Sequence, residues 1–222
     1  YITMTNATFQ WYHSSAEIKE EDQEEEEKKK EEEEEETEIT AEQGESKEAS
    51  KEREAFHLDN VSLNCKSGEL VMIVGKVGAG KSSLLSAMLG EMELTSGRTE
   101  MEGSVSYVPQ QSWILNATLR ENVIMGGVFD NEKYQDALSI SSLVTDIGIL
   151  PRGDQTEIGE KGITLSGGQK QRVSLARAVY SNREICLLDD PLSALDVHVG
   201  RECFERLICE RLRDRLAILV TH

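Results

Sequence analysis

The sequence predicts an α/β fold built around a mostly parallel sheet, and three observations predict it. Short, continuous apolar runs occur at Leu70–Val74, 185–188 and 216–220. Such runs are typical of parallel strands that are covered on both faces. Stretches of helical character separate the runs, and a glycine-rich turn at 75–80 directly follows the first of them. Because strands alternate with helices, we expect βαβ units within one large domain.

The N-terminal region is predicted to form a separate antiparallel unit. Apolar residues alternate along Ile2–Trp11, with a phase slip near Asn6, and again along 56–63. Alternation with a period of two indicates strands that have one buried face. We therefore expect these two strands to pair as an antiparallel hairpin.

One more strand and several helices complete the predicted elements. A helix is expected at Lys81–Leu89, directly after the glycine-rich turn, and a strand at 104–108. Further helices are expected at 135–143, 168–180 and 199–212.

Most of the negative charge lies in one segment. Residues 14–54 hold 20 acidic and 7 basic side chains, a balance of −13, so the rest carries only −5 of the total of −18. Such a composition cannot bury a core, and we expect a disordered insert that enlarges the hairpin loop. Lengthening a loop of about five residues to this size costs about 2 kcal/mol of closure entropy. A solvated linker and a regulatory or partner-binding segment both remain open.

Composition argues against several classes of function. The acidic balance disfavours a nucleic-acid-binding surface, and no stretch approaches the roughly 20 apolar residues of a membrane-spanning helix. The four cysteines have no C-x-x-C spacing, which indicates reduced thiols rather than a disulfide framework or a zinc site. Because the chain begins at Tyr1 and ends on His222 after a strand-like run, we expect a piece of a longer protein.

The glycine-rich turn has the pattern of a phosphate-binding loop. Residues 75–82 read GKVGAGKS and match G-x-x-x-x-G-K-[ST] between a buried strand and a helix. The glycines let successive backbone N–H groups point at phosphate oxygens, and the helix N-terminus favours anions. Lys81 is expected to reach the β- and γ-phosphates, and Ser82 to bind Mg²⁺. The expected nucleotide contacts are Gly75, Gly78, Ala79, Gly80, Lys81, Ser82 and Ser83.

A second candidate metal-binding element, which is acidic, follows about a hundred residues after the phosphate-binding loop. Residues 185–190 read ICLLDD, an apolar strand that ends in two carboxylates. P-loop enzymes use a carboxylate in this position to hold the magnesium shell. Asp189 is therefore the second predicted Mg²⁺ residue.

Residues 165–169 (LSGGQ), placed ahead of 193–196 (SALD) and His222, resemble the ATP-binding cassette family. The strings GEKGITLSGGQKQRVSLARAVYS, VPQQSWILNATLREN and DDPLSALDVHVG are similar to the first nucleotide-binding domain of subfamily C transporters, the multidrug-resistance-associated proteins. The resemblance covers nearly everything except the insert. It implies that residues 1–222 form a P-loop NTPase core with an N-terminal antiparallel β subdomain and an α-helical signature subdomain.

The resemblance also implies roles for the signature residues. Ser166, Gly167, Gly168 and Gln169 would grip the γ-phosphate of a nucleotide bound to the opposing domain of a head-to-tail dimer. Asp196 is implied to communicate across that dimer.

Three further residues carry roles from the same resemblance. Gln110 would touch Mg²⁺ or the attacking water, with Gln111 as the other possible register. His222 would contact the γ-phosphate. Trp11 matches the aromatic residue that stacks on adenine, although packing within the hairpin is also open, whereas Trp113 is expected to pack under the glutamine loop.

The sequence departs from the usual family pattern at one catalytic position. After Asp189 the family usually places a glutamate as the base, and here the residue is Asp190. Aspartate is shorter by one C–C bond, about 1.5 Å, and an error of about 1 Å can cost about a hundredfold in rate. The same aspartate is usual in the first domain of subfamily C. We therefore expect this site to bind MgATP well and to hydrolyse it slowly, with Asp190, Gln110 and His222 as catalytic residues.

Together these features predict an ATPase domain on the cytoplasmic face of a membrane exporter. ATP and Mg²⁺ are the expected cofactors. The expected partners are a second nucleotide-binding domain and transmembrane domains of the same polypeptide, with no nucleic acid and no membrane insertion by this fragment. Two other interpretations remain open: a weakly hydrolytic nucleotide-sensing module that gates a channel, and a soluble cassette ATPase.

Overall fold

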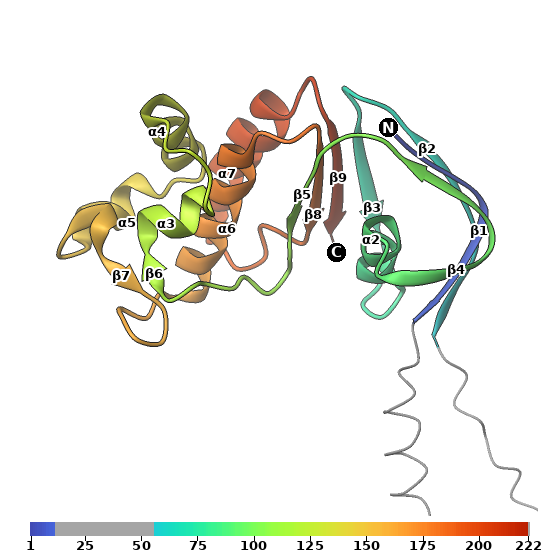
Figure 1. The fold of residues 1–222 in the computed structure, drawn as a ribbon, viewed down its shortest axis with the longest axis horizontal. Helices are drawn as coiled ribbons and strands as arrows, with labels where there is room; N and C mark the ends of the chain where they lie inside the picture. The colour runs from blue at the N-terminus through green and yellow to red at the C-terminus, as the bar shows by residue number, and fades with distance from the viewer. Residues whose placement is uncertain (12–55, 222) are drawn as a thin grey trace, which may run out of the picture.

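The computed structural model describes residues 1–11 and 56–221. The expected disordered insert at 14–54 and the expected role of His222 therefore lie outside the described residues. Figure 1 shows two sheets with the helix α2 (Lys81–Leu89) between them, and a group of helices on the far side of the parallel sheet. The predicted mixed α/β fold is confirmed.

The parallel sheet has four strands in the order β3-β9-β8-β5, and every neighbouring pair is parallel. The strands are β3 (Leu70–Val74), β5 (Val105–Val108), β8 (Ile185–Asp189) and β9 (Leu216–Thr221). All five residues of β8 are buried, as a central strand covered on both faces requires. Parallel strands bring their carboxyl ends to one edge, so the residues that follow β3, β5 and β8 gather there.

The expectation of two covered faces is wrong for β3. Leu70, Met72 and Val74 are exposed on one face of this strand, whereas Val71 and Ile73 pack on the other face against the core around α2. β3 is an edge strand, and the helices that cover the far side of the sheet pack against β8, β9 and β5. A continuous apolar run in the sequence therefore did not predict that, among the described residues, only one face of this edge strand is covered.

The antiparallel sheet contains the predicted hairpin and one strand that was not predicted. β1 (Ile2–Trp11) pairs with β2 (His57–Cys65) on one side and with β4 (Met92–Met101) on the other. β4 escaped prediction because it is mostly polar and exposed. The phase slip near Asn6 is a register shift in both pairings, where Asn6 adopts a φ of 45°. Figure 1 shows this curved sheet wrapped around α2.

Three helices of the helical layer were predicted with other bounds, and two, at Leu119–Ile124 and Val144–Ile149, were not predicted. The helices are α3 (Leu119–Ile124), α4 (Asn131–Ile140), α5 (Val144–Ile149), α6 (Gly167–Ser181) and α7 (Val197–Cys203). α4 begins before residue 135 because the Asp130 side chain accepts a hydrogen bond from the Lys133 backbone N–H and caps it.

The single helix expected at 199–212 is wrong in detail. α7 ends at Cys203 and continues as a π-helix, η2 (Phe204–Arg211). Apolar spacing in a sequence does not reveal which carbonyl each backbone N–H reaches, so this change of helix type was not visible. The short elements β6 (Ala117–Thr118), η1 (Gly153–Gln155) and β7 (Glu157–Ile158) were also missed.

Two apolar cores hold the layers together. One lies around α2 and includes Phe9, Leu85 and Ile218, and the other joins the opposite face of the parallel sheet to the helical layer through residues such as Leu175 and Leu188. Cys65, Cys186, Cys203 and Cys209 form no disulfide bond among the described residues. Among the described residues, no helix has the length and apolar character that crossing a membrane requires.

The close approach of β4 to the bulge in β1 generates a stability prediction. A Cβ built on Gly97 would lie 2.2 Å from the Asn6 carbonyl oxygen, whereas one built on Gly90 meets nothing within 4 Å. The two glycines have nearly equal φ, 82° and 79°. Alanine in this region costs about 1–2 kcal/mol of backbone strain at either position, and overpacking adds about 1–3 kcal/mol. Gly97→Ala should therefore lower the free energy of unfolding more than Gly90→Ala, measured by urea denaturation. Equal losses would contradict the steric argument.

Candidate functional site

The glycine-rich loop has the backbone geometry that its sequence predicts. Gly78 and Gly80 adopt φ of 80° and 84°, a region that residues with a Cβ enter only with strain. Gly80 is also the N-cap of α2, and no side chain caps that end. The first backbone N–H groups of α2 therefore face the loop, where an anion is favoured.

The Lys81 side chain lies against the loop that precedes it. Its Nζ donates hydrogen bonds to the carbonyl oxygens of Gly75 at 2.7 Å and Lys76 at 2.9 Å. The residue is only 8% exposed. The ammonium group is thus fixed inside the turn, a position from which it can meet a polyphosphate.

A cavity of about 300 Å³ lies over this loop. It brings together residues that are far apart in the sequence: the loop itself, Gln110 after β5 and Asp189 at the end of β8. The full lining is Phe56, Val77, Gly78, Ala79, Gly80, Lys81, Ser82, Ser83, Gln110, Asp189 and Val220.

Asp189 joins the loop to the carboxyl end of the sheet. Its Oδ1 accepts a hydrogen bond from Ser82 Oγ at 3.1 Å, and its Oδ2 accepts one from the Tyr107 hydroxyl at 3.4 Å. Burial, together with the negative charge of Asp189, raises the pKa of Tyr107 to about 12, so this hydroxyl stays a donor at neutral pH. Hydroxyl and carboxylate oxygens are the protein ligands that suit Mg²⁺, which takes its remaining ligands from phosphates and water. The residues present therefore fit the ion.

Asp190 is held in an unusual backbone conformation beside Asp189. Its φ is 45°, its N–H donates to the Val220 carbonyl oxygen at 3.0 Å, and it is buried. Gln110 Nε2 donates to Asp190 Oδ2 at 3.4 Å. The structure thus places Gln110 and Asp190, the two predicted catalytic residues that follow β5 and β8, next to each other.

The signature residues lie at a different place, at the N-terminus of α6. Ser166 and Gln169 form a capping box: Ser166 Oγ accepts from the Gln169 N–H, and Gln169 Oε1 accepts from the Ser166 N–H. A Cβ built on Gly168 would lie 3.1 Å from the Ala194 carbonyl oxygen, so this helix start closely approaches the segment at 193–196. None of the four signature residues lines the cavity over the loop.

Asp146 of α5 fixes the first turn of α6 from the side. It accepts hydrogen bonds from Arg172 Nε at 2.7 Å and Nη2 at 2.9 Å, and from Gln169 Nε2 at 3.1 Å. The sequence did not predict a role for Asp146, because its partners Gln169 and Arg172 lie more than 20 residues away and no neighbouring residue identifies them.

Asp196 caps α7 and so sits at the end of the same segment. Its Oδ1 accepts from the backbone N–H groups of His198 and Val199, each at 3.1 Å. The hydrogen bond from Val199, reinforced by that from His198, lowers the pKa of Asp196. Asp196, the residue expected to act across a dimer, is therefore also the N-cap of α7.

The two tryptophans are placed at the surface. Trp11 ends β1 opposite Met92, is 37% exposed and does not line the cavity. Trp113 is also half-exposed, with the Arg177 guanidinium 4.2 Å from its ring centroid. Arg177 of α6 donates to the Trp113 and Asn122 carbonyl oxygens, and burial lowers the pKa of its guanidinium to about 10. Trp113 thus joins the segment after Gln110 to α6 rather than lying buried beneath it.

Phe56, Val77 and Val220 line the cavity although the sequence did not single them out. Val77 occupies a variable position of the loop pattern. Val220 lies near the carboxyl end of β9, and it could have been predicted because parallel strands bring their carboxyl ends to one edge of the sheet. Phe56 could have been found from the hairpin, because the pairing of Gln10 with His57 puts Trp11 and Phe56 in facing positions.

Comparison with known families finds a match to the family model described as ABC transporter, over residues 58–193. Over about three-quarters of the chain, several curated relatives are identical to it at about half of the aligned positions. ABC transporter C family member 3 from Dictyostelium discoideum is 51% identical over 78% of the chain. Multidrug resistance protein mrp-7 from Caenorhabditis elegans is 58% identical over 74%, and human ATP-binding cassette sub-family C member 3 is 55% identical over 74%.

The chain is much shorter than these relatives. The matched part makes up 12% of the Dictyostelium protein and 11% of the nematode and human proteins.

The ion pair between Asp146 and Arg172 generates a stability prediction. Both side chains are largely buried, 11% and 14% exposed. Asp146→Ala would leave the Arg172 charge without this partner, and removing one member of a buried pair costs about 3–5 kcal/mol. The midpoint of urea denaturation should fall accordingly. Glu205→Ala is the matched control, because it removes the partner of Arg201 in a pair of similar length, 2.9 Å, that is exposed; its midpoint should not change measurably. Equal effects of the two substitutions would refute the assignment.

Proposed function

Because the chain belongs to subfamily C of the ABC transporter family, we propose that it is the first nucleotide-binding domain of an exporter. This domain binds MgATP and couples its hydrolysis to transport across a membrane. The observation that carries the proposal is the cavity over the loop at 75–82, where Lys81, Ser82 and Asp189 converge from α2 and β8. We assign residues 1–222 to this one domain.

The phosphate-binding loop and the polar side chains of the cavity lining each have a proposed chemical role. Backbone N–H groups of the loop from Gly75 to Ser83, together with the N-terminus of α2, bind the phosphate oxygens. Lys81 contacts the β- and γ-phosphates. Ser82, Gln110 and Asp189 hold Mg²⁺, which neutralises charge on the phosphates when it is bound.

Two of the proposed hydrolytic residues, Gln110 and Asp190, lie at the carboxyl edge of the same sheet. Asp190 orients the attacking water, Gln110 holds the same water or the metal, and His222 contacts the γ-phosphate. Because the Asp190 carboxylate ends one C–C bond short of a glutamate, we propose slow turnover at this site.

The signature residues serve a partner rather than this cavity. Ser166, Gly167, Gly168 and Gln169 lie at the N-terminus of a 15-residue helix and do not line the cavity over the local loop. We propose that they complete the nucleotide site of a second nucleotide-binding domain in a head-to-tail dimer, with Asp196 beside them. Trp11 stacks on adenine.

The proposed setting is the cytoplasmic face of a membrane, where transmembrane domains of the same polypeptide contact this domain. The relatives are named as transporters and as a multidrug resistance protein. Those names favour an exporter over a channel-gating module or a soluble cassette ATPase.

The first test of this proposal is nucleotide binding. Lys81→Ala should weaken MgATP binding by about 10- to 100-fold, because charge-assisted hydrogen bonds to phosphate are lost. Titration calorimetry of the purified chain measures this affinity. Lys76→Ala is the matched control, since it removes an exposed charge from the same loop and keeps the carbonyl that Lys81 contacts. No uptake by the unchanged chain, or equal uptake by Lys81→Ala, would overturn the proposal.

The second test concerns the hydrolysis rate. Asp190→Glu should raise phosphate release by the full-length protein, by up to about a hundredfold, because the longer side chain restores the reach of the base. Asp190→Asn, which cannot accept a proton, should lower it. A rate that does not rise in Asp190→Glu, while MgATP binding is retained, would refute the geometric explanation.

A further inference from the structure

The side chain of Gln169 is engaged at both ends within the chain. Its Oε1 accepts a hydrogen bond from the Ser166 N–H at 2.9 Å, and its Nε2 donates one to Asp146 Oδ1 at 3.1 Å. These partners fix which end of the carboxamide is oxygen, because the opposite orientation would set donor against donor and acceptor against acceptor. The Gln169 backbone N–H is also engaged, since it donates to Ser166 Oγ at 3.2 Å.

The other three signature residues keep donors for an outside acceptor. Ser166 and Gly167 are exposed, and a Cβ built on Gly167 would meet nothing within 4 Å. The first backbone N–H groups of a helix have no acceptor within the helix, which leaves those of Gly167 and Gly168 for a ligand. Because Ser166 Oγ accepts from the Gln169 N–H, its own hydroxyl proton remains to be donated. The signature residues therefore differ in what they can offer to an anion.

Asp146 of α5 holds both polar side chains that flank this helix start. Besides the bond from Gln169, its oxygens accept from Arg172 Nε and Nη2, and both charged side chains are largely buried. Arg172 offsets the charge of this carboxylate, which would otherwise repel an anion at the start of α6. The guanidinium also lies close to the signature glycines, since a Cβ built on Gly168 would be 3.6 Å from Arg172 Nη1.

We propose that Gln169 and Asp146 are positioning residues of the signature site. Asp146 orients the Gln169 carboxamide, and the carboxamide holds the Ser166 backbone. Contact with the nucleotide of the partner domain is then made by Ser166, Gly167 and Gly168, whereas Gln169 acts through Ser166. The inference rests on the proposed dimer and divides the four signature residues by role.

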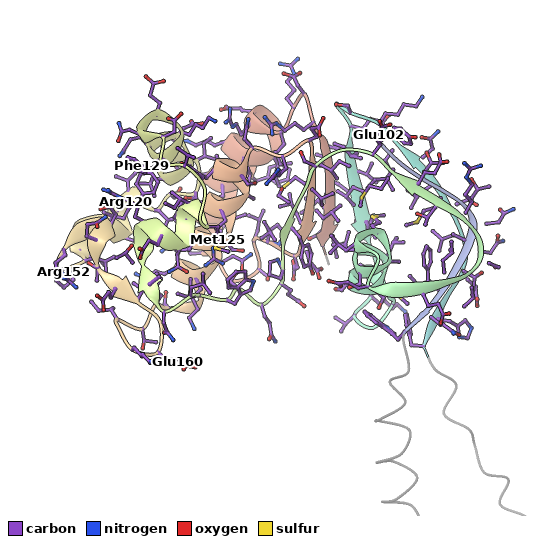
Figure 2. All side chains as sticks on the ribbon, in the orientation of Figure 1. Glu102, Arg120, Met125, Phe129, Arg152 and Glu160 are labelled. Atoms are coloured by element: carbon purple, nitrogen blue, oxygen red, sulfur yellow. The ribbon has the colours of Figure 1, made fainter. Side chains whose placement is uncertain are left out.

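The positioning network lies apart from the chain's own phosphate-binding loop. Figure 2 shows the helical layer, where it labels Arg152 and Glu160, on the other side of the parallel sheet from α2. α6 belongs to this layer (Figure 1), and the cavity over the loop is not lined by Asp146, Gln169 or Arg172. Substitutions in the network should therefore change turnover at the partner's site and leave MgATP binding at the chain's own loop unchanged.

The test reverses the hydrogen bond between residues 146 and 169. In Gln169→Glu the Ser166 N–H keeps an acceptor, but Asp146 meets a second carboxylate in place of a donor. ATP turnover by the full-length protein at saturating MgATP should fall about tenfold, because a charge-assisted hydrogen bond is lost. Asp146→Asn should also lower turnover, because the charge that pairs with Arg172 is removed.

The double variant Asp146→Asn/Gln169→Glu carries the decisive result. It again sets a donor at one position against an acceptor at the other, and it restores the net charge beside Arg172. Turnover should return to within about threefold of the unchanged protein. A direct contact between Gln169 and the nucleotide could not be restored by a change at residue 146.

Two controls separate positioning from folding. Gln135→Glu makes the same chemical change at an exposed position of α4 and should leave turnover unchanged. Titration calorimetry of the purified chain should give the same MgATP affinity and stoichiometry for Gln169→Glu as for the unchanged chain. Loss of folded protein would instead lower the number of MgATP molecules bound per chain.

The outcomes distinguish this inference from the proposed function. If the unchanged full-length protein does not hydrolyse ATP, the proposed function fails and the inference fails with it. If Gln169→Glu keeps full turnover, the inference fails and the proposed function stands. A loss in Gln169→Glu that the double variant does not recover would make Gln169 a nucleotide ligand and refute the positioning role. A parallel fall in turnover and binding stoichiometry would show that the network only supports the fold.

Discussion

The geometry of the candidate site depends on the hydrogen bond between Ser82 and Asp189. Asp189 is almost fully buried, and a buried carboxylate is costly unless polar groups satisfy it. Ser82 at the start of α2 and Tyr107 from β5 do so, and they fix the loop against the carboxyl edge of the sheet. The ends of β5 and β9 bring Gln110 and Val220 to the cavity, where Gln110 also contacts Asp190, the residue that follows β8. Contacts made by Asp189 thus hold together the anion-binding backbone and the oxygen ligands suited to a cation.

A second set of polar contacts ties the helical layer to this edge. Arg177 of α6 grips the Trp113 and Asn122 carbonyl oxygens, and Ser112 donates to Gln171 of the same helix. The segment that follows Gln110 is thereby attached along α6, the helix that begins with the signature residues. The hydrogen bonds to Asn122 and from Ser112 to Gln171 are partly buried, whereas the one to Trp113 is exposed.

The backbone at residue 190 suits the residue found there. A φ of 45° is tolerated better by aspartate and asparagine than by most residues, because a short polar side chain can bond locally. A hydrogen bond from the Asp190 N–H to Val220 on β9 holds this conformation. The short side chain that limits the reach of the carboxylate is therefore also the one that this turn accommodates at low cost.

The sequence by itself determined the elements whose signals are local: the strand, loop and helix around 70–89, the buried strand before Asp189, and the bulge at Asn6. Each of these elements is specified by apolar periodicity, by glycines or by a helix cap within a few residues, so it could be predicted without knowledge of distant contacts. Only the tertiary structure decided which face of β3 stays exposed, that polar β4 joins the hairpin, and that Asp146 holds Arg172. It also put Phe56, rather than Trp11, in the cavity lining. These outcomes arise from pairings between residues far apart in the chain, whose geometry exists only after the sheets have packed around α2.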